Sequence, residues 1–340
     1  MSAHACGQIA TAPARESNCV ASGVGWVVQG GLTSRIEAAG IGMGGGTLPM
    51  VIVHRGGEGS APENTLAAFE DTARCAAASA ARSEAALQQM EPVEWWAETD
   101  LRVTRDGHLV LLHDALVDRT TNGTGEVSSF TLEELQKLDA GCWIASRADT
   151  GGSHFSWSGP RFAGQRVPTL VELFDQFYLT APELNFMLEV KDIGAEDGAR
   201  QLVNEIQSRP GLANRCIIIG FDPVPLEMCV ALDSTLRVGF TVGEPTPEKI
   251  DRAVAMNAHH IGVAGAYISQ DLVASCTARG LEVRWTGTFH STEIRPKQPG
   301  EPEQRSEIAR LVQCGVCGIV HSDGRLLEAA IRSAFDTARL

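Results

Sequence analysis

Short apolar runs alternate with segments of helical periodicity along the chain from residue 49 onward. Between several of the runs, apolar residues recur three and four positions apart, as on one face of an amphipathic helix. The eight apolar runs of strand length are MVIVH, WAETDLRV, LNFMLEV, RCIIIGF, LRVGFTV, HIGVAG, LEVRWTG and GVCGIVHS. The predicted helices cover 65–80, 169–179, 195–208, 246–256, 269–279 and 304–313. Apolar strands joined by helical crossovers are typical of parallel β/α units.

Eight such units in one domain favour an α/β fold of the closed (β/α)8 TIM-barrel type. A doubly wound open sheet is the alternative, but no G-x-G-x-x-G follows the first run to support it. A further run, LVLLHD at 109–114, comes directly after TRDG. Because an Asp-Gly turn joins antiparallel strands, we expect a hairpin extension after the second strand, with this run folding back on 98–104.

The hairpin predicts a cluster of acidic and imidazole side chains. A turn at residues 106–107 sets Asp100 opposite His113, and a turn at 105–106 sets Glu98 there. Side chains alternate between the faces of a strand, so either register puts Glu98, Asp100 and His113 on one face. Unpaired carboxylates beside a strongly apolar strand are costly, which favours a functional site over an exposed hairpin.

Two other strands end in polar residues. Glu189 and Lys191 close the run LNFMLEV, and His54 and Arg55 follow the first run. In a barrel, polar residues at the carboxyl ends of strands point into the catalytic mouth. We therefore expect these four residues to converge with the hairpin cluster.

This set of side chains predicts phosphodiester cleavage. Three converging carboxylates repel one another unless a hard cation lies among them, and oxygen ligands suit Mg²⁺ or Ca²⁺ rather than Zn²⁺. Arginine and lysine beside such a cation suit a phosphate. Two histidines that flank the phosphate can act as general base and general acid.

Charge and cysteine content exclude some classes of function. The net charge of −14 makes nucleic acid an unexpected partner, because phosphate backbones are held by clustered Lys and Arg. No run of about 18 apolar residues exists, so no transmembrane segment is expected. The nine scattered cysteines are interpreted as reduced thiols. Cys314 and Cys317 form a CxxC without a second pair, so neither redox chemistry nor zinc binding is expected there, and His259 and His260 are interpreted as strand-edge residues.

The predicted domains are a flexible Gly/Ala-rich leader, 1–48, and the barrel, 49–340. The N-terminus lacks a basic start and a compact apolar segment, so it is not a clean signal peptide and a cytoplasmic location is expected. The oligomeric state is left open.

The chain resembles the glycerophosphodiester phosphodiesterases, within the phospholipase C-like phosphodiesterase barrels, over about residues 50–325. The motifs that carry the resemblance are HRGGEGSAPENTLAAF, AETDLRVTRDGHLVLLHD, DRTTNGTGEVSSFTLEELQKLDAG, VPTLVELF and LEVK. Their order and spacing together make it specific. The resemblance implies the following roles: metal ligands Glu98, Asp100 and Glu189; catalytic histidines His54 and His113; and substrate or phosphate contacts Arg55, Lys191, Glu63, Asn64 and Trp285.

The chain departs from the family pattern near its end. The late Trp-Thr-Val-Asn motif reads WTGT, with Thr288 in place of Asn. The closing Asp-Gly-Ile-x-Thr-Asp reads CGIVHSD, with changes at Cys317 and at His321-Ser322. These changes put recognition of the alcohol in question more than bond cleavage. An extra stretch, 145–166, contains three aromatic residues and is either a lid or apolar rim, or a surface insertion.

The resemblance implies metal-dependent hydrolysis of a glycerophosphodiester to glycerol 3-phosphate and an alcohol. Two alternatives stay open: head-group release from a lysophospholipid or a sphingolipid on the same barrel, and a barrel that binds phosphate compounds without turnover. The alcohol, the choice between Mg²⁺ and Ca²⁺ and the roles of the two histidines also stay open.

Overall fold

The eight apolar runs form eight parallel strands, as predicted. The computed structural model of the chain describes residues 47–85, 91–141, 160–287 and 302–338, all within the compact unit that follows Gly45. The barrel strands are β1 (Met50–Val53), β2 (Trp95–Val103), β4 (Leu184–Val190), β5 (Cys216–Gly220), β6 (Val238–Gly243), β7 (His260–Val263), β8 (Glu282–Trp285) and β9 (Gly318–His321). Their near-continuous apolar sequences suit strands that are covered on both faces.

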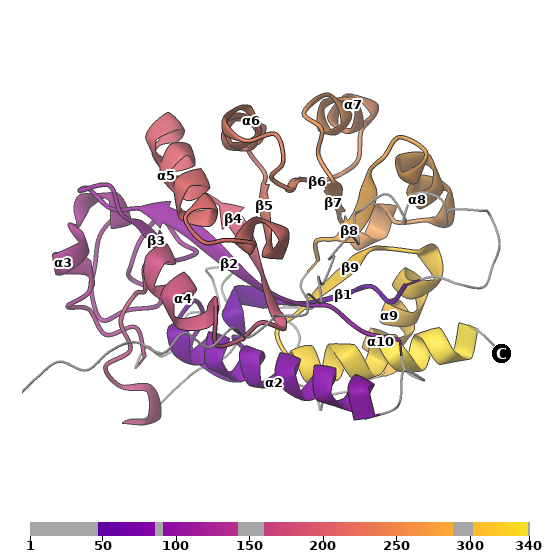
Figure 1. Cartoon of the computed structure of the whole chain (residues 1–340), viewed down its shortest axis with the longest axis horizontal. Helices are drawn as coiled ribbons and strands as arrows, with labels where there is room; N and C mark the ends of the chain where they lie inside the picture. The colour runs from indigo at the N-terminus through magenta and orange to yellow at the C-terminus, as the bar shows by residue number, and fades with distance from the viewer. Residues whose placement is uncertain (1–46, 86–90, 142–159, 288–301, 339–340) are drawn as a thin grey trace, which may run out of the picture. The chain divides into compact units, whose positions relative to one another are not determined.

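The sheet closes on itself because β1 pairs in parallel with both β2 and β9. The helices lie around the outside of the strands (Figure 1). This closure confirms the (β/α)8 barrel and excludes the open sheet. The pairing of β8 with β9 is short: Arg284 is in register with Gly318, and the N–H of Cys317 donates to the carbonyl of Val283 at 2.8 Å.

All six predicted helices are present, with ends shifted by a few residues. The helices are α2 (Leu66–Ala85), α3 (Leu132–Leu135), α4 (Leu170–Phe177), α5 (Ala195–Gln207), α6 (Pro223–Leu232), α7 (Pro247–Ala255), α8 (Gln270–Thr277), α9 (Pro302–Cys314) and α10 (Gly324–Ala338). Helices α3, α6 and α10 were not among the predicted ones; the sequence of α6, PVPLEMCVAL, is apolar except for Glu227 and has no helical stripe. Its start is nevertheless marked by Asp222, whose side chain accepts from the N–H of Val224.

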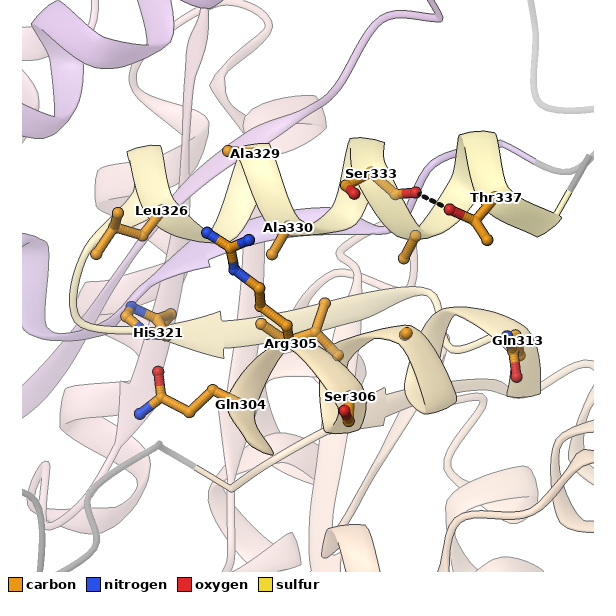
Figure 2. Close-up of a pocket in the computed structure, with 13 residues that line it drawn as sticks. Gln304, Arg305, Ser306, Gln313, His321, Leu326, Ala329, Ala330, Ser333 and Thr337 are labelled. Carbon is orange, nitrogen blue, oxygen red and sulfur yellow. Dashed lines mark hydrogen bonds between the residues drawn. The ribbon is translucent and has the colours of Figure 1, made fainter. Parts of the chain in front are cut away.

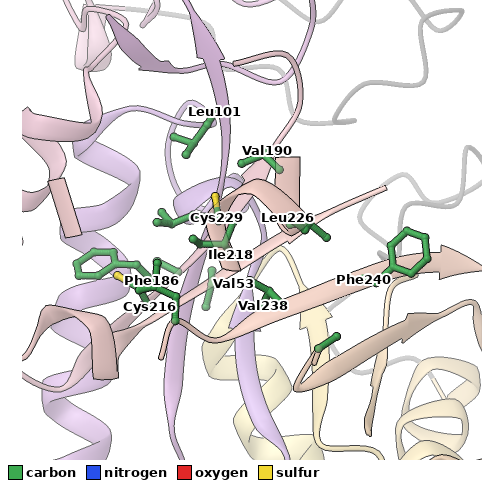
Figure 3. Close-up of a cluster of buried hydrophobic side chains, with 14 of the residues drawn as sticks. Val53, Leu101, Phe186, Val190, Cys216, Ile218, Leu226, Cys229, Val238 and Phe240 are labelled. Carbon is green, nitrogen blue, oxygen red and sulfur yellow. The ribbon is translucent and has the colours of Figure 1, made fainter. Parts of the chain in front are cut away.

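Alternation along the strands separates two apolar layers. The outer layer joins strands to helices, and Ile218 of β5 belongs to it together with Leu226 and Cys229 of α6 (Figure 3). The second layer contains no helix residue, which places it inside the barrel. Its members are Met50, Ile52, Trp96, Met187, Ile217, Ile219 and Val320. Residues two positions further along β2 and β4 from this layer therefore also face the interior, toward the carboxyl ends of the strands.

The predicted register of the hairpin is wrong. β3 (Leu109–Leu111) pairs antiparallel with the end of β2, but Val103 faces Leu109, and the N–H of Leu112 donates to the carbonyl of Asp100. The loop therefore has three residues rather than two, with Gly107 at a φ of 86°. A three-residue loop with glycine in the left-handed region is a common hairpin connection. It shifts the ladder by one residue, so Asp100 lies opposite Leu112 and not His113.

Between β2 and β4, the described part of the chain has a small apolar cluster of its own. It contains Val110, Leu112, Val117, Val127, Leu135, Ala140 and Val167. The short helices η2 (Val127–Ser129) and α3 belong to this excursion.

Two predictions fall partly outside the described residues. The leader 1–48 does so except for its last two positions, and most of the stretch 145–166 does so as well. The division of the chain at residue 48 therefore stays a prediction. No helix in the described ranges is both long and apolar enough to cross a membrane.

Candidate active site

Three carboxylates meet inside the barrel near the carboxyl ends of β2 and β4. Glu98 and Asp100 lie two residues apart on one face of β2, and Asp100 is in register with Glu189 of β4. One oxygen from each carboxylate lies within 4.8 Å of the other two. Glu98 and Asp100 are 3% and 1% exposed. The structure thus brings together the three residues predicted as metal ligands.

The positive charges near Glu98 do not compensate its burial and the two neighbouring carboxylates. Burial, and then the Asp100 and Glu189 carboxylates, raise the pKa of Glu98 well above its ordinary value. Its Oε2 accepts from the backbone N–H of Arg55 at 2.8 Å, but its buried Oε1 has no hydrogen-bond partner among the described residues. A buried carboxylate oxygen of this kind is costly beside like charges. A cation bound between the carboxylates would remove that cost.

Lys191 and Arg55, the predicted phosphate contacts, flank the carboxylates. Nζ of Lys191 lies 2.6 Å from Oε1 of Glu189 and 3.2 Å from Oδ1 of Asp100. Nε of Arg55 lies 3.8 Å from Oδ2 of Asp100. Burial would raise the pKa of Asp100, but the charges of Lys191, His113 and Arg55 outweigh it and hold that pKa below its ordinary value. Asp100 is therefore ionised in the site.

A third buried cation, Arg284 of β8, was not predicted. Its Nη2 donates to Oγ1 of Thr241 at 3.0 Å. Gly262 of β7 leaves room for the guanidinium, because a Cβ at that position would lie 2.9 Å from Nη2. Burial lowers the pKa of Arg284, and the nearby Glu189 carboxylate opposes this. An arginine within an apolar strand run was the sequence signal for this residue.

His54 lies at the end of β1, in the short helix η1 (His54–Gly56), and its ring is oriented by Glu58. The two side chains are 2.6 Å apart, Nδ1 to Oε1. Since a carboxylate can only accept, this bond places the proton on Nδ1 and the lone pair on Nε2. Burial and the adjacent Arg55 lower the pKa of His54 well below its ordinary value, which keeps the ring neutral.

The backbone at Arg55 is unusual. Its φ of 51° is in the left-handed region, which non-glycine residues rarely adopt. This conformation aims the N–H of Arg55 at Glu98. Backbone strain of this kind clusters at functional sites, where it fixes the position of a ligand or catalytic group.

His113 is held by a chain of charged groups. Its Nδ1 lies 2.6 Å from Oδ1 of Asp114, and Arg119 donates to both Asp114 and Glu63. Glu63 also accepts from Nη1 of Arg55 at 2.9 Å. Burial would raise the pKa of Glu63, but Arg55 and Arg119 lower it to about 2. Charge-assisted hydrogen bonds therefore connect His113 to Arg55, the residue that follows His54. They pass through Asp114, Arg119 and Glu63.

Glu63 and Asn64 direct their polar atoms at protein groups. Both oxygens of Glu63 accept from arginines. The amide of Asn64 donates to Oδ2 of Asp100 at 3.0 Å and accepts from Oγ1 of Thr99 at 2.7 Å. This favours a positioning role over the predicted contact with substrate. Trp285 is 5% exposed in the outer apolar layer, and its predicted role stays a prediction.

Three partners of the site were not singled out from the sequence: Glu58, Asp114 and Arg119. Asp114 directly follows His113, and Glu58 comes four residues after His54. The four-residue spacing from His54, within a Gly-Gly turn, was the sequence feature that could have identified Glu58. No sequence feature pointed to Arg119, because it bonds to Glu63, 56 positions away, from a loop without periodicity.

A groove lies between α9 and α10 and reaches His321 at the end of β9. It has a volume of about 370 Å³. Figure 2 shows His321 and Leu326 at one end of the two helices and Gln313 and Thr337 toward the other. Ala330 is part of the lining between them. The groove is thus outside the barrel, and the carboxylates do not line it.

Sequence comparison decides the family. The model of the Glycerophosphoryl diester phosphodiesterase family matches residues 96–322, which is more than half of the chain. The chain belongs to the glycerophosphoryl diester phosphodiesterase family. Membership confirms the resemblance drawn from the motifs and makes the chain an enzyme that hydrolyses glycerophosphodiesters.

Individual relatives agree with this assignment. A glycerophosphodiester phosphodiesterase of Caldanaerobacter subterraneus is 29% identical over 83% of this chain and 98% of its own length. Human glycerophosphodiester phosphodiesterase 1 is 31% identical over 51% of this chain and 42% of its own length. A phosphodiesterase of Oleispira antarctica, solved in complex with the product sn-glycerol-3-phosphate, is 23% identical, with a TM-score of 0.62 over 84% of this chain and 97% of its own. This last likeness supports the fold.

Proposed function

We propose that this phosphodiesterase cleaves its substrate with a divalent cation held by Glu98, Asp100 and Glu189, while His54 and His113 transfer protons. The observation that carries the proposal is the arrangement of the two imidazoles. Each ring has its Nδ1 fixed by its own carboxylate at 2.6 Å. The Asp100 carboxylate acts on the pKa of His54, and His113 acts on the pKa of Asp100, which supports one shared site for the two histidines and the carboxylate cluster.

The residues present fit a hard divalent cation. All three donors are carboxylate oxygens, the ligands that Mg²⁺ and Ca²⁺ prefer. Oε1 of Glu98 is the oxygen that lacks a hydrogen-bond partner within the described ranges, and its carboxylate has the raised pKa expected beside two like charges. Such a cation, when bound, supplies Lewis-acid polarisation of the phosphoryl oxygens.

The protein's own cations bind and orient the phosphate. Burial would lower the pKa of Lys191, but the Asp100 and Glu189 carboxylates raise it, so the ammonium stays charged. Lys191 lies at the edge of the carboxylate cluster and Arg55 lies beside Asp100. A phosphodiester seated against the cluster would meet both charges.

We assign His54 as the proton acceptor and His113 as the proton donor. The lowered pKa of His54 keeps its ring neutral, with the lone pair on Nε2, so it can take a proton from the attacking oxygen. His113 would deliver a proton through Nε2 to the oxygen of the leaving alcohol. The attacking oxygen is either water or the substrate's own neighbouring hydroxyl, which would give a cyclic phosphate first.

An assay of product release tests the proposal. Purified full-length protein is incubated with glycerophosphocholine in Mg²⁺, in Ca²⁺ and after treatment with EDTA, and glycerol 3-phosphate and choline are measured. We expect release in the presence of at least one of the two cations and none after EDTA. Unchanged turnover after EDTA would contradict the metal role, and no turnover under any condition would favour the barrel that binds phosphate compounds without cleaving them.

Lysophospholipids are the second candidate substrates. The groove beside His321 supports them, because Ile308, Leu326 and Ala330 contribute apolar surface to it. The same assay with lysophosphatidylcholine distinguishes the two substrates. Faster choline release from the lysolipid than from glycerophosphocholine would favour this second function.

The expectations about nucleic acid as a partner and about the location in the cell stay predictions. The net charge of −14 supports the absence of a nucleic-acid partner. The cytoplasmic location rests only on the sequence of the N-terminus.

A further inference from the structure

A second cluster of possible metal ligands lies at the other end of the barrel. His260 begins β7, Glu282 begins β8, and Cys317 directly precedes β9. One ligand atom from each of these three residues lies within 4.8 Å of the other two. Amino ends of parallel strands meet at the rim opposite the catalytic mouth, so this cluster is separate from the carboxylates of the active site.

The three side chains offer three different donor atoms. Nε2 of His260 lies 3.0 Å from Oε2 of Glu282. His260 is 3% exposed, and its Nδ1 is buried without a hydrogen-bond partner among the described residues. Cys317 packs against the inner apolar layer. A nitrogen, a carboxylate oxygen and a sulfur at one point are a ligand set for Zn²⁺, whereas Mg²⁺ and Ca²⁺ prefer oxygen alone.

We propose that His260, Glu282 and Cys317 form a Zn²⁺ site at the amino end of the barrel, with water as the fourth ligand. The proposal differs from the sequence interpretation, in which His260 is a strand-edge residue rather than a ligand. It uses only the second cysteine of the CxxC, since Cys314 is not part of the cluster and its sulfur lies 4.0 Å from Nη1 of Arg310. The site uses a position, Cys317, at which the chain departs from the pattern of its family.

The position of the site suggests what it does for the barrel. Its ligands come from three consecutive strands, and the pairing between the last two of them is the short one, with Arg284 and Gly318 in register. A metal ion that joins these strands would hold that seam closed. Because the ligands are brought together only in the folded chain, the free energy of zinc binding would add to the stability of the fold.

Cobalt substitution tests the proposal on the intact chain. The metal-free protein is titrated with Co²⁺ under a non-thiol reductant, and its absorption spectrum is recorded. We expect a thiolate-to-cobalt charge-transfer band and tetrahedral d–d bands that saturate at one ion per chain and are lost on addition of Zn²⁺. Co²⁺ at the active-site carboxylates gives no thiolate band, so failure of this proposal is distinguishable from failure of the proposed function. Absence of the band in the wild-type protein overturns the proposal.

Variants identify the ligands. Cys317→Ser should abolish the charge-transfer band and the rise in Tm that Zn²⁺ gives the wild type. Cys314→Ser is the matched control and should retain both. Glu282→Gln should keep the band but require more Co²⁺ to saturate it. If Cys317→Ser does not fold, His260→Asn provides the second test, because it should lose the tetrahedral d–d bands. A charge-transfer band that survives in Cys317→Ser, or tetrahedral d–d bands that survive in His260→Asn, would contradict the site.

Discussion

Arg119 donates to the carboxylate of Glu63 from both terminal nitrogens, at 2.7 and 2.8 Å, and to Asp114 from Nε, at 2.6 Å. It thereby connects the orienting partner of His113 to Glu63, which is itself paired with Arg55. The two histidines that we propose as catalytic come from distant parts of the chain. Arg119 joins Asp114, the partner of His113, to Glu63, and Glu63 joins Arg55, the residue that follows His54.

Replacing Arg119 should therefore impair catalysis without removing a group that carries out chemistry. In Arg119→Lys, the planar fork that binds two carboxylates at once is lost although the charge remains. Loss of partners of this kind typically costs about 10- to 100-fold in activity. We expect kcat to fall within that range and KM to change little, as measured by steady-state kinetics with glycerophosphocholine.

Arg105→Ala is the control for this variant. Arg105 forms an exposed ion pair with Glu134, at 3.1 Å. Exposed pairs contribute about 0–1 kcal/mol, so this variant should keep the wild-type kcat. A wild-type kcat in Arg119→Lys would show that His113 does not depend on this network.

The charge of Glu63 should make stability depend on pH. Its pKa is lowered from the ordinary 4.5 to about 2 in the folded protein. A carboxyl with a lowered folded-state pKa stabilises the fold above its unfolded-state pKa, and this contribution is lost as the pH falls toward the folded-state value. The shift corresponds to roughly 3 kcal/mol at neutral pH.

Glu63→Gln tests this because glutamine has the shape of the protonated carboxyl. Urea unfolding at neutral pH should show the variant to be less stable than the wild type. The difference in free energy of unfolding should stay constant from about pH 7 to 5 and narrow below pH 5. A difference that does not change between pH 7 and pH 4 would indicate that Glu63 is not ionised in the folded state.

The sequence predicted the barrel well because its strands are covered on both faces. Strands of this kind read as continuous apolar runs, such as CIIIG of β5, and their carboxyl ends necessarily meet at one rim. That geometry was enough to bring Glu189 of β4 to Asp100 of β2. The same rule led us to expect His54 at this rim, because His54 directly follows the first apolar run, and the motifs agreed with it.

What the sequence could not predict depends on local turns and distant contacts. The register of the hairpin depended on whether the loop had two or three residues, and Gly107 permits both. A substrate or phosphate contact for Glu63 was only what the resemblance implied, and it stays a prediction. Its pairing with Arg119 depends on the path of the excursion between β2 and β4, which no periodicity encodes.

The two histidines should differ in how they respond to the leaving group. His54→Ala and His113→Ala should each lower kcat for glycerophosphocholine by about 100-fold or more, the range for positioned acid–base groups. In a p-nitrophenyl phosphodiester, the leaving group is p-nitrophenolate, which departs without being protonated. His113→Ala should therefore recover most of its rate on that substrate, and His54→Ala should not.

The outcome of this comparison assigns the roles. Recovery in His54→Ala instead of His113→Ala would reverse our assignment of acceptor and donor. Near-normal rates in either variant on glycerophosphocholine would remove that histidine from proton transfer.

Metal affinity should depend on Glu189 in particular. Glu98 and Asp100 share β2, whereas Glu189 closes the cluster from β4, so Glu189→Gln leaves two carboxylates on one strand. In the wild type, Mg²⁺ or Ca²⁺ should raise the Tm of the EDTA-treated protein, because ligands that bind the folded state stabilise it. The variant should need at least about 10-fold more cation for the same rise. Glu133→Gln, at an exposed pair with Lys137, is the control and should titrate like the wild type. An unaltered titration in Glu189→Gln would mean that the cation binds without this carboxylate, and the three-carboxylate site would then be wrong.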